Sequence, residues 1–463
     1  MIMGSVTHSP LARLRTDMAD TQDVNFLYAI DDRMPLWQGV VYGLQWAAIV
    51  FPSLIIACAL AGQALKLGPD AQVRFLQLTL LVSGAFCVIQ TLWGHRYPLL
   101  EGPATALLLT FIGLAHGGIQ TIQGGLLLGG LLLVIAGTFR VLRSLMRWFT
   151  PNVVGVILLL IAFTLLPHLL PRVSGTNPQH PAGQYTIFTF CLMLILVIAF
   201  LSRRLKGFWQ TIAMFLGVVL GTAVFGVLGW IEWHPVAMAP WFAAPRPWPL
   251  TFPRFEWPAM LAFALAYVAV MVNSVGSIQG IASVTDLNRL PKALHRGILI
   301  NGLSGICCGL VGIVGTVSYS MSPGVVLITR VASRFAITFC GVIVAGTAFA
   351  PKLAALFAVV PGPVVGAALC VGLGGQIGAG LAIIHGQERR LSGRDYLVIG
   401  IPIIVGTLVS LLPTAFFTDI PTAVQVFLGN GLIMGILLVL LMEHGLLREG
   451  PAPVRDTDSS RTL

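Results

Sequence analysis

Residues 97–105 read Tyr-Pro-Leu-Leu-Glu-Gly-Pro-Ala-Thr and interrupt an apolar stretch long enough to cross a membrane. Glu101, Gly102 and Pro103 stand in a row where a membrane helix would normally continue. An unpaired backbone group is costly in hydrocarbon, so a broken backbone at membrane depth is tolerated only against protein or around a watery cavity. An ionisable residue at that depth is a functional-site candidate. We therefore predict a binding site at this break.

A second interrupted stretch, residues 318–324, reads Ser-Tyr-Ser-Met-Ser-Pro-Gly and lies in the other half of the chain. Two Gly/Pro-broken segments at matching positions in two halves are the best sequence-level indication of a transporter's binding site. Half-helices starting after Pro103 and Pro323 would direct free N–H groups and positive dipole ends at the cavity. Such a site suits either a neutral, planar solute with several hydrogen-bonding groups or an anion.

The composition is that of a polytopic helical membrane protein. Of 463 residues, 56% are apolar and 10% charged, with a mean hydropathy of +0.89, whereas soluble domains carry about 25% charged residues. The net charge of +10 does not indicate a nucleic-acid partner, because the basic residues occupy short loops between apolar spans, as in cytoplasmic loops. The polar N-terminal arm (1–36) and C-terminal tail (447–463) are too short to form domains.

No cofactor or metal is expected. The seven cysteines fall inside apolar spans without metal-ligand spacing, and they are expected to serve as small packing residues. The chain has no phosphate-binding loop, nucleophile elbow or zinc signature. We therefore do not expect an enzyme.

About 20 apolar residues per span predict fourteen spans, of which the third and tenth are too short or too broken to be plain helices. The spans are expected near residues 38–57, 74–93, 98–115, 121–139, 150–169, 185–202, 209–230, 257–275, 297–314, 322–334, 335–350, 359–384, 394–412 and 421–445. Fifteen basic residues on one side against six on the other predict cytoplasmic termini. Seven spans per half would make the halves an inverted repeat.

Several polar residues near the breaks are candidates for contact with a solute. The hydroxyl groups and the carboxylate could bind it, or they could satisfy the local backbone. Glu101 could carry a proton, or brace the broken helix. Asn273 and Ser277 lie four residues apart on one helical face and could bind a solute or join helices. The complete set also includes Gln45, a lone polar residue in the first span, and Thr105, Ser318, Tyr319, Ser320 and Ser322.

Glycine-rich faces are the other feature of the spans. Gly124-Gly125 with Gly129-Gly130, and the run from Gly372 to Gly380, are expected to allow close helix packing.

Five stretches of the chain together resemble the nucleobase–ascorbate transporter family (nucleobase:cation symporter 2), which includes uracil and xanthine permeases. The resemblance extends from Tyr28 to about Glu443 and indicates a divergent purine/pyrimidine permease branch. The stretches are Tyr28–Pro35, Gln45-Trp46 where the family usually has Gln-His, Gly102-Pro-Ala-Thr105, Tyr319–Arg330 with Gly324-Val-Val-Leu-Ile-Thr-Arg330, and Gly429-Asn-Gly-Leu-Ile-Met-Gly435.

The resemblance implies fourteen spans in a seven-plus-seven inverted repeat, divided into a core domain (37–146 and 257–350) and a gate domain (147–234 and 351–446). Short antiparallel strands in spans three and ten would hold the base. The protein would be a multi-pass homodimer of the bacterial plasma membrane that imports a nucleobase, usually with a proton or Na⁺.

The resemblance also assigns site residues. Backbone contacts to the base would fall at about Ala104, Thr105 and Ser320, and Tyr319 or Met321 would line its face. The family's glutamate in the eighth span falls on Asn273, and a histidine of some members falls on Ser277. Its tenth-span glutamate or glutamine falls on Met321, and the following asparagine on Ser322. Glu101 is therefore expected to take over part of the acidic role, with Gly102, Pro103, Pro323 and Gly324 supporting the breaks.

Two other functions fit the residues. An anion transporter of the sulfate-permease type would need no carboxylate at the opposed half-helices, although the tail after Glu443 is too short for those proteins' regulatory domain. A membrane protein that binds without transport would also be consistent with the absent carboxylates.

Overall fold

The computed structural model describes residues 26–138, 148–176, 180–246, 252–386, 391–413, 416 and 428–448. Within these residues, nine helices are long and apolar enough to cross a membrane, and a tenth span results if α16 and α17, bent by 91°, count as one. The long helices are α2 (Leu36–Ala64), α3 (Pro69–Leu92), α5 (Ile119–Thr138), α7 (Pro151–Thr164) continued by α8 (Leu166–Ser174), α9 (Tyr185–Arg204), α13 (Trp257–Val284), α14 (Leu290–Val311), α18 (Gly362–His385) and α19 (Gly393–Leu411). The chain is therefore a multi-pass membrane protein.

Shorter helices complete the bundle. They are α4 (Thr105–Gly113), α10 (Phe208–Thr211), α11 (Ala213–Val227), α12 (His234–Met238), α15 (Ser322–Thr329), α16 (Arg334–Thr347), α17 (Pro351–Ala358) and α21 (Gly431–Leu441), which a π-helical turn extends to Leu446. Each of the fourteen predicted ranges overlaps a helix, but several of these helices are too short to span a bilayer alone. The count of fourteen and the inverted repeat stay predictions, and residues 421–427 of the last predicted span lie outside the described residues.

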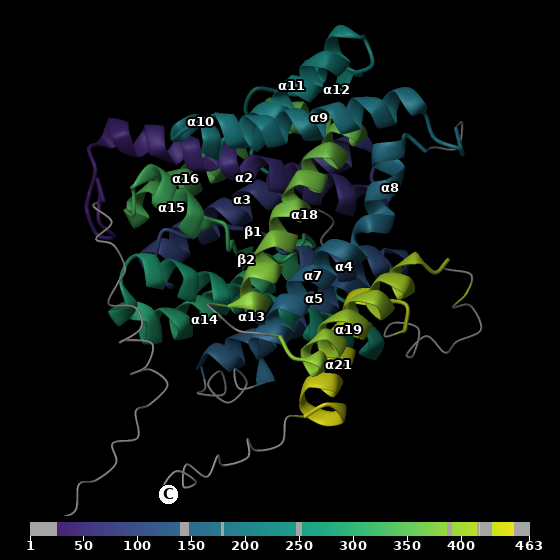
Figure 1. Cartoon of the computed structure of the whole chain (residues 1–463). Coiled ribbons are helices and arrows are strands. Elements are labelled where there is room, and N and C mark those ends of the chain that lie inside the picture. The colour runs from purple at the N-terminus through teal and green to yellow at the C-terminus, as the bar shows by residue number, and fades with distance from the viewer. Residues whose placement is uncertain are drawn as a thin grey trace, which may run out of the picture.

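Both predicted breaks are extended backbone, and they pair with each other. Strand β1 (Glu101–Pro103) is antiparallel to β2 (Thr316–Ser318), with Glu101 opposite Ser318 and Pro103 opposite Thr316. The ladder continues at both ends, since the Tyr319 N–H donates to the Leu100 carbonyl (2.9 Å) and the Ala104 N–H to the Gly315 carbonyl (2.8 Å). The predicted short antiparallel strands are confirmed. Figure 1 shows them in the middle of the molecule, behind α18.

Each strand leads into a short helix, as predicted, but the second boundary differs from the prediction. The extended segment begins at Thr316, two residues before the predicted break. Helix α15 begins at Ser322 and so includes Pro323 in its first turn. A start after Pro323 was wrong, because proline lacks only an N–H group that the first helical turn leaves unpaired in any case.

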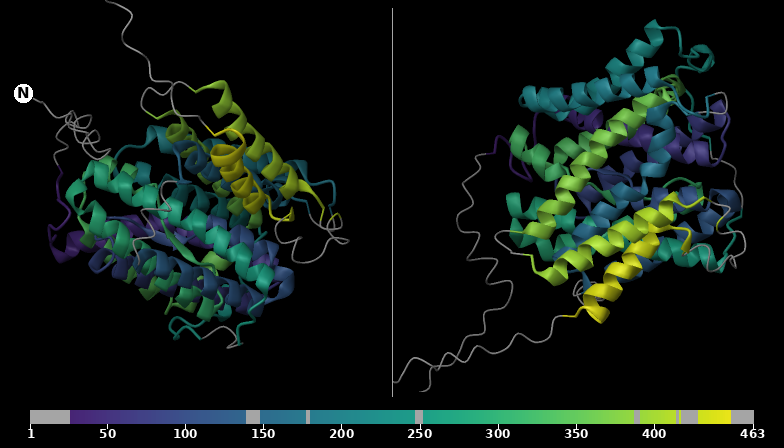
Figure 2. Two further views of the ribbon diagram at one scale, coloured as in Figure 1. Left: turned by 90° about the horizontal axis from the view of Figure 1, so that it is seen from below. Right: turned by 45° about the vertical axis from the view of Figure 1, so that its right-hand side comes forward.

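The helices form two packed groups. In one, α5 packs against α14 and α13, and α16 packs against α3 and α2; in the other, α18 packs against α7 and α9, and α19 against α21 and α7. Seen from below, the yellow-green α19 and α21 lie to one side of the teal α13 and α14 (Figure 2). Helix α2 contacts α18 and α11 of the other group, so it lies at the boundary between them.

Glycines account for the closest helix contacts of the first group. A Cβ added to Gly125 would lie 2.2 Å from the Phe263 ring, and one added to Gly130 would lie 2.7 Å from the Ile306 nitrogen. The predicted close packing is confirmed there. It is wrong for Gly374, Gly375 and Gly378, where an added Cβ would meet nothing within 4 Å, because no described residue packs against these faces of α18.

Candidate functional site

A central cavity of about 420 Å³ lies between the two groups of helices, beside the paired strands. Its walls come from α2, α4, α7, α13, α18 and the segment that joins β2 to α15. This volume is in the range of small-molecule sites. Its wall is apolar apart from six polar side chains and carries no charged side chain among the described residues. The six are Ser53, Thr105, Asn273, Tyr319, Ser320 and Gln376.

The ends of the strands supply free backbone donors. In the described part of the chain, the backbone N–H groups of Thr105 and Ser320 donate to no other residue. Thr105 is the first residue of α4, and Ser320 lies two residues before α15. The Thr105 N–H is free because the first N–H groups of a helix have no intrahelical partner, and such groups readily donate to a bound ligand. The Ser320 N–H is free because it lies between the end of β2 and the start of α15. The two predicted backbone contacts therefore line a single cavity.

Asn273 presents the other polar edge of the cavity. It is half-buried in the middle of α13, and its carboxamide has no hydrogen-bond partner among the described residues. Because Asn273 lines the cavity and its carboxamide bonds to no described group, it is available to a ligand. A carboxamide offers two donors and one acceptor oxygen, which match the N–H and C=O groups along one edge of a heterocyclic base.

Tyr319 stands against β1. Its hydroxyl lies 3.1 Å from the Ser53 oxygen and 3.3 Å from the Pro103 carbonyl, so it can donate to either. A Cβ added to Gly102 would lie 2.4 Å from the Tyr319 hydroxyl oxygen. Gly102 is therefore required for the close approach of this ring, which forms part of the cavity wall.

Two of the predicted contact residues lie behind the cavity wall instead. The Ser277 hydroxyl is 2.8 Å from the Asn273 carbonyl and 2.9 Å from the Ser318 carbonyl, so it joins α13 to β2. The Ser322 hydroxyl accepts the Leu100 N–H at 3.2 Å. Both side chains are buried. They support the strands, and their predicted contact with a solute stays a prediction.

The remaining predicted residues are divided between the cavity and its supports. Ala104, Pro103 and Met321 line the cavity, and Met321 is 48% exposed. Gln45 is buried and donates to the Thr211 hydroxyl at 2.8 Å, which joins α2 to α10. Pro323 and Gly324 lie in the first turn of α15 and are not part of the cavity wall.

Glu101 is the first residue of β1, and its side chain is buried and does not line the cavity. One carboxylate oxygen accepts the Ser318 hydroxyl and lies 3.6 Å from Nε2 of His95. The other oxygen, Oε2, has no partner among the described residues. Glu101 therefore contacts β2, which leads directly to Ser320 in the cavity.

His95 belongs to this buried network. Its position beside Arg96 at a span end predicts an anchor at the membrane interface, and this prediction is wrong, since the residue is 1% exposed. Its Nδ1 accepts the Tyr97 N–H at 3.0 Å, so the ring directs Nε2 toward Glu101. The backbone at Arg96 has a φ of +59°, and this turn folds the chain back so that His95 comes under the strand.

Two lining residues were missed from the sequence. Ser53 of α2 lies against Tyr319, and Gln376 of α18 donates to the Leu158 carbonyl at 3.2 Å. Gln376 is a lone amide within the glycine run of α18. That isolated polar residue was the available signal, because a polar group within a span faces protein or a cavity.

The fold and the site define a class of protein. Two strands pair in the middle of the protein, and each leads into a short helix beside the central cavity. This is the arrangement of a membrane transporter with discontinuous spans. The transmembrane domain of the cyanobacterial bicarbonate transporter BicA has a similar structure, with a TM-score of 0.61 at 16% identity, covering 82% of this chain and 98% of that one. At this identity the likeness concerns the fold alone.

Comparison of the sequence with known proteins identifies the family. Residues 37–415 match the model of the Permease family (Xan_ur_permease), and the chain belongs to this family. The uric acid permease PucK of Bacillus subtilis is 26% identical over 411 residues, covering 88% of this chain and 94% of the relative. The nucleobase transporter PlUacP of Paenibacillus larvae is 25% identical over 407 residues, covering 86% and 92%.

The family resemblance inferred from the motifs is thus confirmed. The sulfate-permease alternative is not favoured, because only the architecture is shared with an anion transporter, whereas the family model covers most of the chain.

Proposed function

We propose that the protein is a secondary active transporter that imports a nucleobase, a purine or a pyrimidine such as uracil or xanthine. The observation that supports this most directly is the uncharged cavity beside the paired strands. Its free N–H groups at Thr105 and Ser320 and the unpaired carboxamide of Asn273 offer hydrogen bonds to a planar solute. Relatives named as uric acid and nucleobase carriers support the same substrate class.

In this proposal the base lies flat between the strand ends and α13. Asn273 pairs with one amide edge, and the backbone at Thr105 and Ser320 holds the opposite edge. Tyr319 and Met321 cover a ring face. A small inorganic anion such as sulfate is less suited to this cavity, because no cationic side chain lines it among the described residues.

Transport follows from movement of one helix group against the other. The strands and α13 belong to the group that we assign to the core domain, and α18 to the gate domain. Because the cavity lies between them, sliding or rocking of the core would carry the base from one side of the membrane to the other. The termini would lie in the cytoplasm, and two chains would form a homodimer.

We assign proton coupling to Glu101. Its carboxylate is buried, it has one oxygen without a partner among the described residues, and it contacts β2 through Ser318. A buried carboxyl is more easily kept neutral than charged, so proton uptake here would accompany movement of the core away from water. Na⁺ in place of the proton is the alternative coupling ion.

The test is uptake of labelled bases into proteoliposomes with imposed proton or sodium gradients. We expect accumulation of at least one base, driven by an inward proton gradient and inhibited by unlabelled uracil, xanthine or adenine but not by sulfate or bicarbonate. Binding in detergent without flux would instead support the non-transporting alternative.

The coupling residue is tested by Glu101→Gln. We expect base uptake down its own concentration gradient to continue and its dependence on the proton gradient to disappear. If the variant keeps the wild-type dependence on pH, Glu101 is not the proton carrier.

A further inference from the structure

A second cavity of about 420 Å³ lies along the same boundary between the helix groups, next to the central one. The same helices contribute to both. On α2, Ala57 lines the central cavity and Ala59 the second one; on α18, Ala368 lines the central cavity and Val365 the second one. The second cavity is formed by helix ends that the charge bias places outside. With that topology, the second cavity lies on the outer side of the central site.

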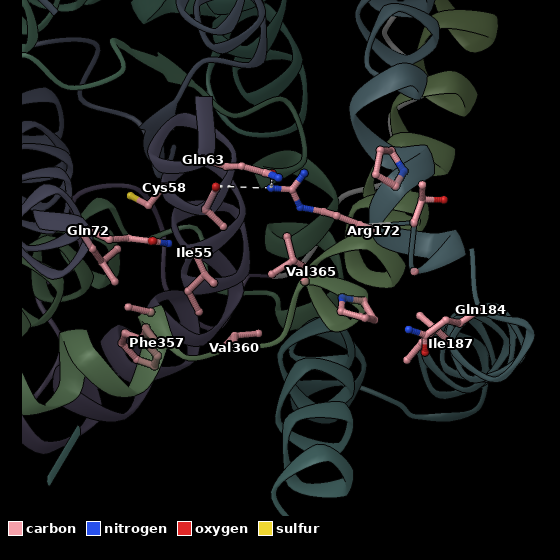
Figure 3. A pocket seen from close by; sticks show the side chains of 18 residues that line it. Ile55, Cys58, Gln63, Gln72, Arg172, Gln184, Ile187, Phe357, Val360 and Val365 are labelled. Atoms are coloured by element: carbon pink, nitrogen blue, oxygen red, sulfur yellow. Dashed lines mark hydrogen bonds between the residues drawn. The ribbon is translucent and has the colours of Figure 1, made fainter. Parts of the chain in front are cut away.

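Arg172 of α8 extends into this cavity. Its guanidinium donates to the His168 carbonyl (3.1 Å), to the Ala59 carbonyl (3.4 Å) and to the Gln63 side-chain oxygen (2.6 Å). Figure 3 shows it reaching from α8 toward Gln63 on α2. All three acceptors are neutral, and no carboxylate lies within 4 Å of Arg172 in the described part of the chain. A half-buried cation is therefore left without a counter-charge.

Two unpaired amides line the same cavity as this cation. The side chains of Gln72 on α3 and Gln184 before α9 line the cavity and have no hydrogen-bond partner among the described residues. Apart from Gln63 and Thr176, the remaining wall is mostly apolar and includes Ile55, Ile187 and the Phe357 ring (Figure 3). A small hydrated anion gains little from apolar walls, whereas a planar organic anion would bury its faces against them.

We infer that this cavity is a recruitment site for the anionic form of a heterocyclic base, with Arg172 as the residue that selects the charge. The inference rests on the proposed transport of nucleobases. A guanidinium binds a delocalised anion through charge-assisted hydrogen bonds, and Gln72 and Gln184 can bond its ring nitrogens and carbonyls. The bound anionic base would compete with the Gln63 side chain for the Arg172 guanidinium. This competition would loosen the contact between α8 and α2 before the base moves inward.

The test compares uptake of urate, an anion at neutral pH, with uptake of uncharged hypoxanthine. We expect Arg172→Gln to raise the ratio of the KM for urate to the KM for hypoxanthine about tenfold, the effect of one charge-assisted hydrogen bond. Arg172→Lys should keep the ratio within about threefold of wild type, because the charge remains. Arg74→Gln is the matched control, since it removes a cation at the same end of the molecule that does not line the cavity.

A purely structural contact between α8 and α2 predicts a different result. Both substrates would then change alike in Arg172→Gln, and the ratio would stay at the wild-type value, which would overturn the inference. The inference would also be overturned if Arg74→Gln raised the KM ratio as much as Arg172→Gln does. A general positive field at this end of the molecule would then explain the effects of both variants.

A second readout does not depend on transport. Phenylglyoxal modifies arginine, and its reaction at Arg172 in the purified full-length protein can be followed by peptide mass spectrometry. We expect urate to slow this reaction and hypoxanthine to slow it less. Protection by urate without uptake of any base would refute the proposed function and leave the site standing. Uptake with neither protection nor a change in the KM ratio would refute the site alone, and equal protection by sulfate would exclude the heterocycle.

Discussion

Replacement of Asn273 by alanine should weaken base binding without weakening the fold. The carboxamide lines the central cavity and makes no hydrogen bond to any described residue. If it forms two hydrogen bonds with the base, each worth about 0.5–1.5 kcal/mol net, its loss costs about 1–3 kcal/mol. Since 1.4 kcal/mol is tenfold in affinity, the KM for the base should rise about 5- to 150-fold. Thermal unfolding should change little, because no internal hydrogen bond is lost.

Ser277→Ala is the matched control one helical turn away. Its hydroxyl joins the Asn273 and Ser318 carbonyls, so its removal should lower stability by about 1 kcal/mol with a smaller effect on KM. The assays are proteoliposome uptake over a range of base concentrations and thermal unfolding in detergent. The assignment of Asn273 to the base is refuted if Asn273→Ala leaves KM at the wild-type value, or destabilises the protein as much as Ser277→Ala does.

Three further changes test other parts of the structure. Gly102→Ala should reduce uptake at least tenfold, because the new Cβ would lie 2.4 Å from the Tyr319 hydroxyl and overpacking of this kind costs about 1–3 kcal/mol; unchanged uptake would show that the ring is free to move. Gln376→Ala should raise KM by less than Asn273→Ala does, because this amide already donates to the Leu158 carbonyl; competition assays measure both. The hydrogen bond from Arg289 lowers the pKa of Asp31 from 3.8 to about 2. The contribution of this carboxylate to stability is therefore present above pH 3.8 and is lost as the pH falls through 2. Asp31→Asn should remove this part of the pH dependence of unfolding.

The apolar helices and the two breaks could be predicted because the membrane imposes simple rules. A span needs about 20 apolar residues, and a run such as Glu101-Gly102-Pro103 cannot continue a helix there. The pairing of the two breaks came from the family resemblance, since no local pattern in a three-residue strand identifies its partner. The exact helix start at Ser322 could not be predicted, because proline is tolerated in the first turn of a helix. The spacing of the residues alone does not show whether a helix begins before or after Pro323.

The buried network and the gate side of the cavity could not be predicted. His95 stands next to Arg96 in the sequence, as an interfacial pair would, and only the left-handed turn at Arg96 brings it under Glu101. The run from Gly372 to Gly380 indicated helix packing, whereas several of its faces are open. In both cases the outcome depends on how distant segments meet, and hydropathy does not report this.

The separation of the carboxylate from the cavity bears on how coupling could work. In the proposed mechanism the base in the central cavity meets only neutral groups, so the proton on Glu101 cannot act through direct contact with it. The path is short nevertheless, because Glu101 accepts the Ser318 hydroxyl and the Ser318 carbonyl faces the Ser277 hydroxyl behind Asn273. A carboxylate can only accept a hydrogen bond from Ser318, whereas a protonated carboxyl can also donate one. Protonation would thus reset the bonding of β2, and with it the position of Ser320 and Asn273 on either side of the base.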